Sequence, residues 1–215
     1  MCLSSEVSEA LGIKDRRARQ KQLLRQEILD AARDILVTEG YERLSMRRVA
    51  ERIEYSPTAI YLHFKDKQEL VVSLCDETFA RLVEELEVTE AKFKDPFVRL
   101  KKGLRAYVDF GLKYPQHYLA TFVVPHDDPE QAARYNDPGS MGMQALGRLR
   151  ASINDCVRQA KVRRVDVDTT ARALWCAVHG LTSLMIVCQR FPWGDRDAVI
   201  NLLIDSAVDG LRRRR

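Results

Sequence analysis

Side chains that can form directed hydrogen bonds gather on one face of a short segment in the first third of the chain. Thr58, Tyr61 and His63 supply two hydroxyls and an imidazole there. Ile60 and Phe64 recur four residues apart, which places both on another face of a helix. This pattern predicts a helix of about two turns, held from behind by its apolar side so that the polar face meets a partner.

Two helix-start signals position this polar face. Ser45 is a good N-cap, and Val49 and Ile53 continue an apolar stripe after it. Ser56 is a second N-cap, followed at once by Pro57, which is tolerated in a first turn because the amide that it lacks has no helical partner there. The spacing is that of a helix-turn-helix. We expect its helices over residues 46–53 and 57–64.

A longer helix is expected on each side of this motif. Residues 19–39 carry an apolar stripe and stop at Gly40, a residue that commonly ends helices. After the motif, Asp66 and Glu69 form a capping-box pattern that opens a helix over residues 67–92. At 1.5 Å per residue that helix is roughly 39 Å long, so it should leave one domain and enter the next.

The remainder of the chain keeps helical spacing and shows no sustained alternation of apolar and polar residues. We therefore expect an all-α protein with a three-helix head and a six-helix body. The expected domains are an arm over residues 1–18, the head over 19–66 and the body over 67–215. Further helices are expected over residues 96–114, 115–124, 140–161, 167–190 and 196–213, with a loop over 125–139.

The composition excludes several classes of protein. The chain has 215 residues, of which 46% are hydrophobic, enough for a buried core. No apolar run reaches the length of a membrane span, and the first residues carry charge rather than an apolar signal core. Five cysteines, an odd number without a C-x-x-C pair, argue against a disulfide framework or a structural zinc site. We expect a cytoplasmic protein that does not enter a membrane.

Basic residues concentrate just before the first long helix. The net charge of +4 is modest and by itself indicates no partner. Between residues 14 and 25, however, six Lys and Arg residues face only Asp15. We expect the arm over residues 1–18 to be basic and disordered, and to contact phosphates or a minor groove if the helix-turn-helix binds DNA. The alternative is a solvated, charged helix start.

The helix expected over residues 167–190 is apolar almost all round. Such a helix is buried on every side, and near the end of the chain one domain can cover only part of it. We therefore expect a homodimer in which this helix and the helix over 196–213 pair with the same two helices of a second copy.

The order of these elements, and the residues at their junctions, resemble the TetR family of bacterial transcriptional regulators. The family pattern is met by the residues Gly40, Tyr41, Ser45, Ala50, Ser56, Tyr61, Leu62, His63, Phe64, Lys67, Glu69 and Leu70. The body also resembles a subgroup with a Trp near a His-Gly pair, met by Trp175, His179 and Gly180.

The resemblance implies a set of DNA contacts. Arg47 is the residue expected to read a guanine edge in the major groove, and Ser45 is expected to cap its helix and face a phosphate. Ala59 and Leu62 could touch thymine methyl groups, and Lys67 is expected at a phosphate. The full set of expected DNA-binding residues is Ser45, Arg47, Tyr55, Ser56, Pro57, Thr58, Ala59, Tyr61, Leu62, His63 and Lys67. For Tyr61 and His63, packing against the first helix is the alternative role.

One residue departs from the family pattern. The family commonly has Gly where this chain has Glu54, in the turn between the two helices of the motif. If that turn needs a left-handed backbone, a residue other than Gly costs roughly 1 kcal/mol there. We expect the head to tolerate this cost.

A small-molecule effector is the second expected partner, because an effector cavity is usually apolar with a few placed donors. The residues expected to line it are Tyr107, Phe110, Tyr114, His117, Tyr118, Phe122, Met141, Trp175, His179 and Met185; plain core packing is the alternative for each. His126, Asp127 and Asp128 are adjacent in the expected loop and lack the spread that a metal site needs. No metal, cofactor or catalytic residue is expected.

The function implied is that of a repressor, released from a near-palindromic operator when a small apolar effector shifts the long helix between head and body. A co-repressor would act through the same helix with the opposite sign. One alternative is a DNA-coating protein without an effector, and a redox-sensing variant built on Cys176 or Cys188 is a minor one. An enzyme is least expected, because no nucleophile elbow, phosphate-binding glycine loop or ligand triad is present.

Overall fold

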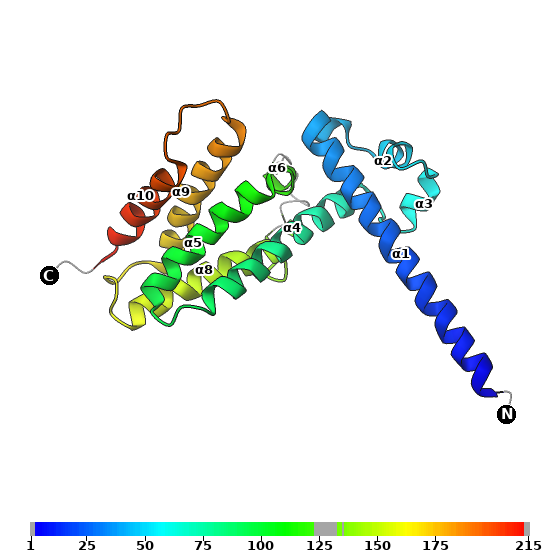
Figure 1. Cartoon of the computed structure of the whole chain (residues 1–215), viewed down its shortest axis with the longest axis horizontal. Helices are drawn as coiled ribbons and strands as arrows, with labels where there is room; N and C mark the ends of the chain where they lie inside the picture. The colour runs from blue at the N-terminus through cyan, green and yellow to red at the C-terminus, as the bar shows by residue number, and fades with distance from the viewer. Residues whose placement is uncertain (1–2, 123–132, 135, 213–215) are drawn as a thin grey trace. The chain divides into compact units, whose positions relative to one another are not determined.

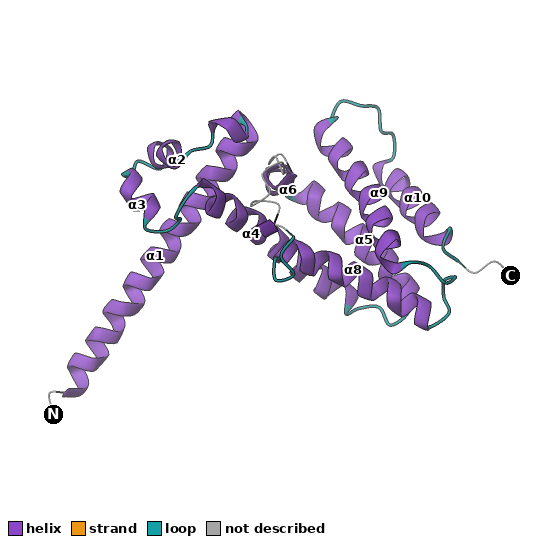
Figure 2. Ribbon diagram, turned by 180° about the vertical axis from the view of Figure 1, so that it is seen from behind, coloured by secondary structure: helices purple, strands orange, loops and turns teal. Residues whose placement is uncertain are grey.

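The fold was obtained as a computed structural model, which describes residues 3–122, 133–134 and 136–212, with the backbone alone for residues 3–14. Within these residues the regular structure is helical, apart from an isolated bridge between Val162 and Arg212 (Figure 2). The chain divides into two compact units, Met1–Leu74 and Cys75–Arg215. The expected all-α fold class is confirmed.

The N-terminal unit is built on one long helix. Helix α1 spans Leu3–Glu39 and extends well past α2 and α3 (Figure 1). The expectation that residues 1–18 form a disordered arm is therefore wrong from residue 3 onward. Glu, Ala, Leu, Lys, Arg and Gln make up most of α1, and all of them propagate a helix at little cost in side-chain entropy.

The head follows in short elements. A 3₁₀ turn spans Tyr41–Arg43, α2 spans Met46–Arg52, and α3 spans Pro57–Tyr61. The apolar stripe expected on α1 is buried against these elements, and its most enclosed members include Ile28, Ala32 and Ile35. Gly40 ends α1 with a φ of 88°, a conformation that only glycine adopts at little cost.

Helix α4 spans Lys67–Glu90 and contributes to both units. Its start is a capping box in a shifted form: Asp66 Oδ1 accepts from Glu69 N at 2.8 Å, and Glu69 Oε2 accepts from Lys65 N at 2.6 Å. Leu70 and Leu74 are buried. The unit boundary lies after Leu74 rather than at the expected residue 66, because the first turns of α4 belong to the core of the head.

Within the described residues, the C-terminal unit contains the rest of α4 and five further helices with defined bounds. These are α5 (Pro96–Lys113), α6 (Pro115–Phe122), α8 (Met141–Arg158), α9 (Val167–Val187) and α10 (Arg196–Asp209). Each agrees with an expected helix to within a few residues. The loop expected over 125–139, including His126, Asp127 and Asp128, falls mostly outside the described residues.

Helix α9 is the centre of this unit and packs against α5, α8 and α10. The approach of α5 is close: a Cβ added to Gly111 would lie 2.3 Å from Thr182 Cγ2. Among the described helices, α9 also has the length and apolar composition that could cross a bilayer, a test that a core helix passes too. It packs against three helices of this unit, and part of its apolar surface is exposed.

Candidate nucleic-acid interface and ligand cavity

Helix α3 and the three residues that follow it have an exposed side with hydroxyl groups and a buried apolar side. Ile60 and Phe64 are 0% and 1% exposed, whereas Tyr61 and Leu62 are 55% and 74% exposed. Ser56 caps the helix by accepting a hydrogen bond from Ala59 N at 3.3 Å. Burial of two large side chains therefore fixes a five-residue helix that could not persist alone.

The arginines of α2 differ in the helix that supplies their acidic partners. Ser45 caps the helix by accepting from Arg48 N at 3.2 Å. The Arg47 side chain is 83% exposed, and its Nε lies 3.0 Å from Glu51 Oε1, one turn along the same helix. Because an i,i+4 surface pair of this kind contributes only about 0.3–0.5 kcal/mol, the guanidinium of Arg47 can leave it for a base edge at little cost.

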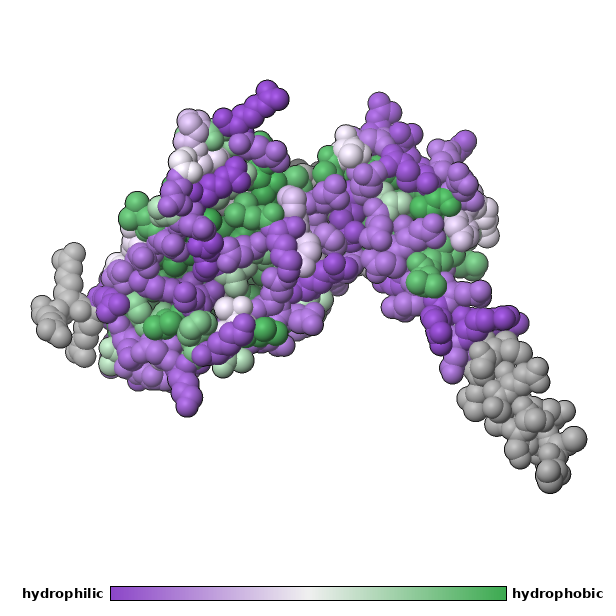
Figure 3. Space-filling view, viewed as in Figure 1, coloured by the Kyte–Doolittle hydropathy of each residue, from purple (hydrophilic) through white to green (hydrophobic). Residues whose placement is uncertain are grey.

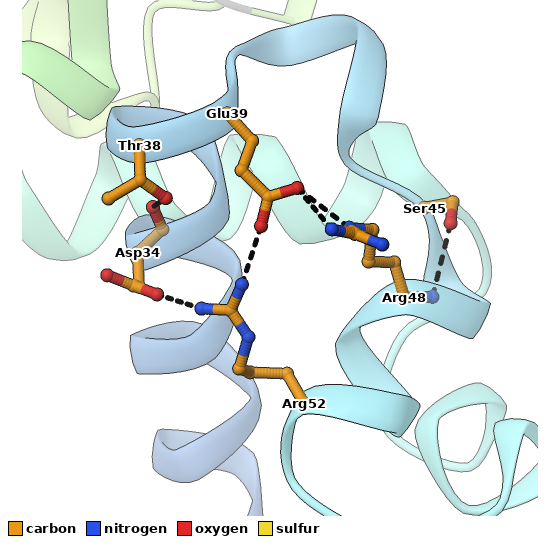
Figure 4. Close-up of polar contacts among 6 residues, drawn as sticks. All are labelled: Asp34, Thr38, Glu39, Ser45, Arg48 and Arg52. Atoms are coloured by element: carbon orange, nitrogen blue, oxygen red, sulfur yellow. Dashed lines mark hydrogen bonds and ion pairs between the residues drawn. The ribbon is translucent and has the colours of Figure 1, made fainter.

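Arg48 and Arg52 instead bind α2 to α1 (Figure 4). Arg48 Nη2 lies 2.5 Å from Glu39 Oε2, and Arg52 Nη2 lies 2.6 Å from Glu39 Oε1. Arg52 also pairs with Asp34. This network was not predicted from the sequence. The available signal was Asp34 and Glu39 near the end of α1, followed by two arginines four residues apart on α2.

The turn between α2 and α3 has the predicted strain. Glu54 adopts a φ of 59°, in the left-handed region that disfavours residues with a Cβ. The backbone N–H of its neighbour Tyr55 donates a hydrogen bond to Ala50 O at 2.9 Å, which stabilises the turn. The left-handed backbone considered for this turn is therefore present at Glu54.

His63 lies partly buried at the end of the α3 turn. Burial lowers the pKa of its imidazole below the usual value, and the charges of Lys21 and Arg25 lower it further. Its Nδ1 atom is buried without a hydrogen-bond partner among the described atoms. The His63 imidazole thus favours its neutral form beside two cations. A phosphate bound nearby would raise its pKa, because the negative charge stabilises the protonated ring.

Lys67, which is expected at a phosphate, also has partners inside the head. Its Nζ donates to Tyr41 O at 2.8 Å and lies 3.7 Å from the centroid of the Tyr41 ring. Burial lowers the pKa of this ammonium group. Lys67 therefore has a contact inside the head that the sequence interpretation did not include.

The other expected DNA-binding residues share one region of the head. Ser45, Arg47, Tyr55, Ser56, Pro57, Thr58, Tyr61 and Leu62 are exposed, while Ala59, His63 and Lys67 are partly buried. Their individual contacts with DNA stay predictions.

The C-terminal unit contains a cavity of about 500 Å³. Residues from α4, α5, α6, α8 and α9 line it, and most of them are apolar, including Phe79, Leu82, Leu104 and Leu146. A volume of this size suits a small organic molecule.

Three of the residues expected at the cavity are among its lining: Tyr107, Phe122 and Trp175. Phe110 and Met185 are core residues instead, and Tyr114 packs on Phe110 with ring centroids 5.2 Å apart. The remaining four, His117, Tyr118, Met141 and His179, are also outside the lining. Helical spacing identifies large side chains on α5, α6 and α9, but the rotation of each helix decides which of them face the cavity.

The lining residues that the sequence analysis missed come mainly from α4 and α8. They include Phe79, Leu82 and Leu86 on α4, and Leu146 and Leu149 on α8. The signal available was the apolar stripe on each helix, which equally predicts plain core. Two basic residues, Arg150 and Arg172, also line the cavity.

A polar cluster adjoins the cavity where α5, α6 and α9 meet. The hydroxyls of Tyr107 and Tyr118 lie 3.2 Å and 2.5 Å from His179 Nδ1, and Trp175 Nε1 donates to the Tyr107 hydroxyl at 3.3 Å. Burial raises the pKa of Tyr107 to about 12 and lowers that of His179. At neutral pH the cluster therefore consists of uncharged phenols and an uncharged imidazole.

Family comparisons agree with this architecture. The family model described as bacterial regulatory proteins, tetR family, matches residues 28–74, and the tetracyclin repressor-like C-terminal domain matches residues 100–207. The second match alone spans half of the chain. The chain belongs to the TetR family. The Trp and His-Gly subgroup stays a prediction, although Trp175 and His179 lie within the second match.

Among curated relatives of this TetR family protein, the transcriptional repressor AcnR of Corynebacterium efficiens is 36% identical over 107 residues. That match covers 43% of this chain and 57% of AcnR, so the chain spans little more than half the length of that relative. The transcriptional activator FasR of Mycolicibacterium smegmatis is 28% identical over 189 residues, covering 86% of this chain and 78% of FasR.

Solved structures show the same fold. The transcriptional regulator FadR of Bacillus subtilis, solved in complex with stearoyl-CoA, matches with a TM-score of 0.76 at 16% identity, covering 87% of this chain and 99% of that one. A TetR family regulator from Marinobacter aquaeolei matches with a TM-score of 0.73 at 17% identity, covering 93% of this chain and 100% of that one. Regulators of the family bind DNA operators and small-molecule effectors, and dimerisation is typical of them.

Proposed function

We propose that this chain is a sequence-specific DNA-binding repressor, whose homodimer leaves a near-palindromic operator when a small apolar molecule enters the cavity of the C-terminal unit. The observation that carries the proposal is that α3 and the residues after it, up to Phe64, have a buried side with Ile60 and Phe64 and an exposed side that includes Tyr61 and Leu62. An exposed apolar residue beside exposed hydroxyls suits the major groove, which offers both methyl groups and hydrogen-bonding edges.

The contacts follow from the chemistry of the exposed side chains. Arg47 reads a guanine through its two-pronged donor, while Thr58, Tyr61 and His63 meet phosphates. Basic residues on α1 add sequence-independent attraction; Arg16, Arg17, Arg19 and Lys21 are all exposed. The protein acts in the cytoplasm, where bacterial operator DNA lies.

A second copy of the chain covers the exposed side of α9 and α10. Leu184 and Val187 on α9 are 53% and 66% exposed, and Leu202 on α10 is 69% exposed. The space-filling view shows hydrophobic surface on this unit over α9 and its neighbours (Figure 3). Two α9–α10 pairs would form a four-helix interface with two-fold symmetry. Such a dimer matches an operator whose half-sites lie about 34–36 Å apart.

The cavity supplies the site for the effector. It is largely apolar, and a related structure, FadR, holds stearoyl-CoA. Phe79, Leu82 and Leu86 of α4 line it, and α4 begins in the N-terminal unit. A ligand that displaces α4 would change the placement of the two recognition helices, and release follows if the ligand prefers the geometry that does not bind DNA.

The cavity favours a regulated protein over a DNA-coating protein, which needs no such space. Selection of bound fragments from random duplex DNA tests the proposal directly. We expect enriched fragments with two inverted half-sites spaced by one helical turn or a multiple of it. Enrichment of no sequence, with binding that depends only on salt, would instead identify a coating protein.

A further inference from the structure

The hydroxyl of Tyr107 is the feature of the cavity that points to a class of ligand. Tyr107 lines the cavity and is 9% exposed, so its polar atom is nearly removed from water. A buried hydroxyl that lacks a good acceptor costs free energy that a suitable ligand recovers.

The hydrogen bonds from this hydroxyl to acceptors within the protein are long. Its O–H lies 3.4 Å from the Tyr118 hydroxyl and 3.2 Å from His179 Nδ1. Hydrogen bonds between hydroxyls are usually about 2.7–2.8 Å long. Both contacts are therefore hydrogen bonds at the long end of the usual range, and neither is a strong one.

Tyr118 also competes for the nearer acceptor. Its hydroxyl lies 2.5 Å from His179 Nδ1, and an unprotonated ring nitrogen has one lone pair. If the proton is on Nδ1 instead, that atom accepts nothing, and Tyr107 is left with Tyr118 alone at 3.4 Å. In both tautomers the Tyr107 O–H is the least satisfied donor of the cluster.

Trp175 strengthens this donor. Its Nε1 donates to the Tyr107 oxygen at 3.3 Å, and Trp175 also lines the cavity. A hydroxyl that accepts one hydrogen bond becomes a better donor for the next, because the two bonds polarise each other. Burial also keeps the phenol protonated, since its pKa is raised to about 12.

We propose that the cavity selects an apolar molecule carrying a neutral hydrogen-bond-accepting oxygen, such as a ketone or ester carbonyl, and that Tyr107 is the residue that recognises this oxygen. The inference rests on the proposed function, because it assumes that the cavity is a ligand site. It adds the class of ligand and the residue that determines specificity. The apolar lining accommodates the body of the molecule, and the Tyr107 hydroxyl donates to its oxygen.

A matched pair of probes isolates the oxygen. Butylbenzene and 4-phenylbutan-2-one differ by one methylene replaced by one carbonyl. Binding is followed by the fluorescence of Trp175 in a Trp193→Phe background, which leaves one tryptophan, at the cavity. In Tyr107→Phe we expect the affinity for the ketone to fall about three- to tenfold while that for butylbenzene stays unchanged. Tyr114→Phe is the control, because Tyr114 is outside the cavity lining and should alter neither affinity.

A second variant tests the competition for His179. Tyr118→Phe leaves His179 Nδ1 to Tyr107, so we expect the preference for the ketone over butylbenzene to shrink although Tyr118 is not part of the lining. Equal losses for both probes in Tyr107→Phe would overturn the inference and assign Tyr107 a packing role, while leaving the cavity as a ligand site. Failure of the parent protein to bind either probe would overturn the proposed ligand cavity itself.

Discussion

Lys67 Nζ donates to the carbonyl oxygen of Tyr41 at 2.8 Å and lies 3.7 Å from the centroid of the Tyr41 ring. The first residue of α4 thus holds the 3₁₀ turn that follows α1. One cation satisfies a backbone carbonyl and stacks on an aromatic face, so two connecting segments of the head depend on a single side chain.

We expect Lys67→Met to lower the free energy of unfolding by about 1–2 kcal/mol, because the hydrogen bond and the cation–π contact are lost while the aliphatic stem is kept. Urea unfolding measures this change. Titration of the same variant should show weaker binding to specific and scrambled duplexes alike, since a phosphate contact carries no sequence information. Unchanged stability would contradict the role of Lys67 inside the head.

Arg47→Ala should act on sequence discrimination instead. Its guanidinium is 83% exposed and pairs with Glu51 along its own helix, so its loss should leave the stability nearly unchanged. We expect discrimination at one base pair to fall by about 1–3 kcal/mol, measured by titrating the selected operator and its single-base variants. Arg81→Ala is the matched control, because Arg81 also belongs to an i,i+4 surface pair, with Glu77. Equal effects of the two substitutions would rule out base reading by Arg47.

Local rules predicted the head well. Caps at Ser45 and Ser56, the helix end at Gly40 and the left-handed turn at Glu54 each depend on neighbours within a few residues, so the sequence contains the information directly. The arm was predicted wrongly because its charge suggested solvation, whereas its residue types support a helix.

The cavity could be predicted only in part, since its lining depends on contacts between distant segments. Tyr107 and Phe110 are three residues apart on α5, yet only Tyr107 lines the cavity. The difference arises from the rotation of α5 against α9, which Gly111 and Thr182 set by their close approach. No helical periodicity read within one segment reports that rotation.

Glu54→Gly should stabilise the head, because glycine adopts the φ of 59° found there without steric cost. We expect the free energy of unfolding to rise by up to about 1 kcal/mol. Glu54→Ala removes the same carboxylate while keeping a Cβ, so it should give no such gain. An equal gain in both variants would assign the effect to charge rather than to the backbone.

Protonation of His179 should destabilise the C-terminal unit. Burial lowers its pKa in the folded protein below the usual value of about 6.5. As the pH falls below about 6.5, the unfolded chain takes up a proton that the folded protein does not yet bind, so stability is lost through that window and is fully present above it. In His179→Asn, whose amide can replace Nδ1 as a partner for Tyr118, the decline between about pH 7 and pH 5 should be shallower. Parallel unfolding curves for the two proteins across this range would contradict the prediction.

Val187→Glu should dissociate the proposed dimer. Val187 is 66% exposed on α9, and a carboxylate there would be buried without a partner in an interface between two copies. We expect sedimentation analysis at micromolar concentration to show monomers and the preference for paired half-sites to disappear. Val98→Glu places the same change on α5, where Val98 is 40% exposed, and should leave the dimer intact. Because both variants gain one carboxylate on the same unit, dissociation in both would indicate a general effect of charge, and dissociation in neither would place the interface away from α9.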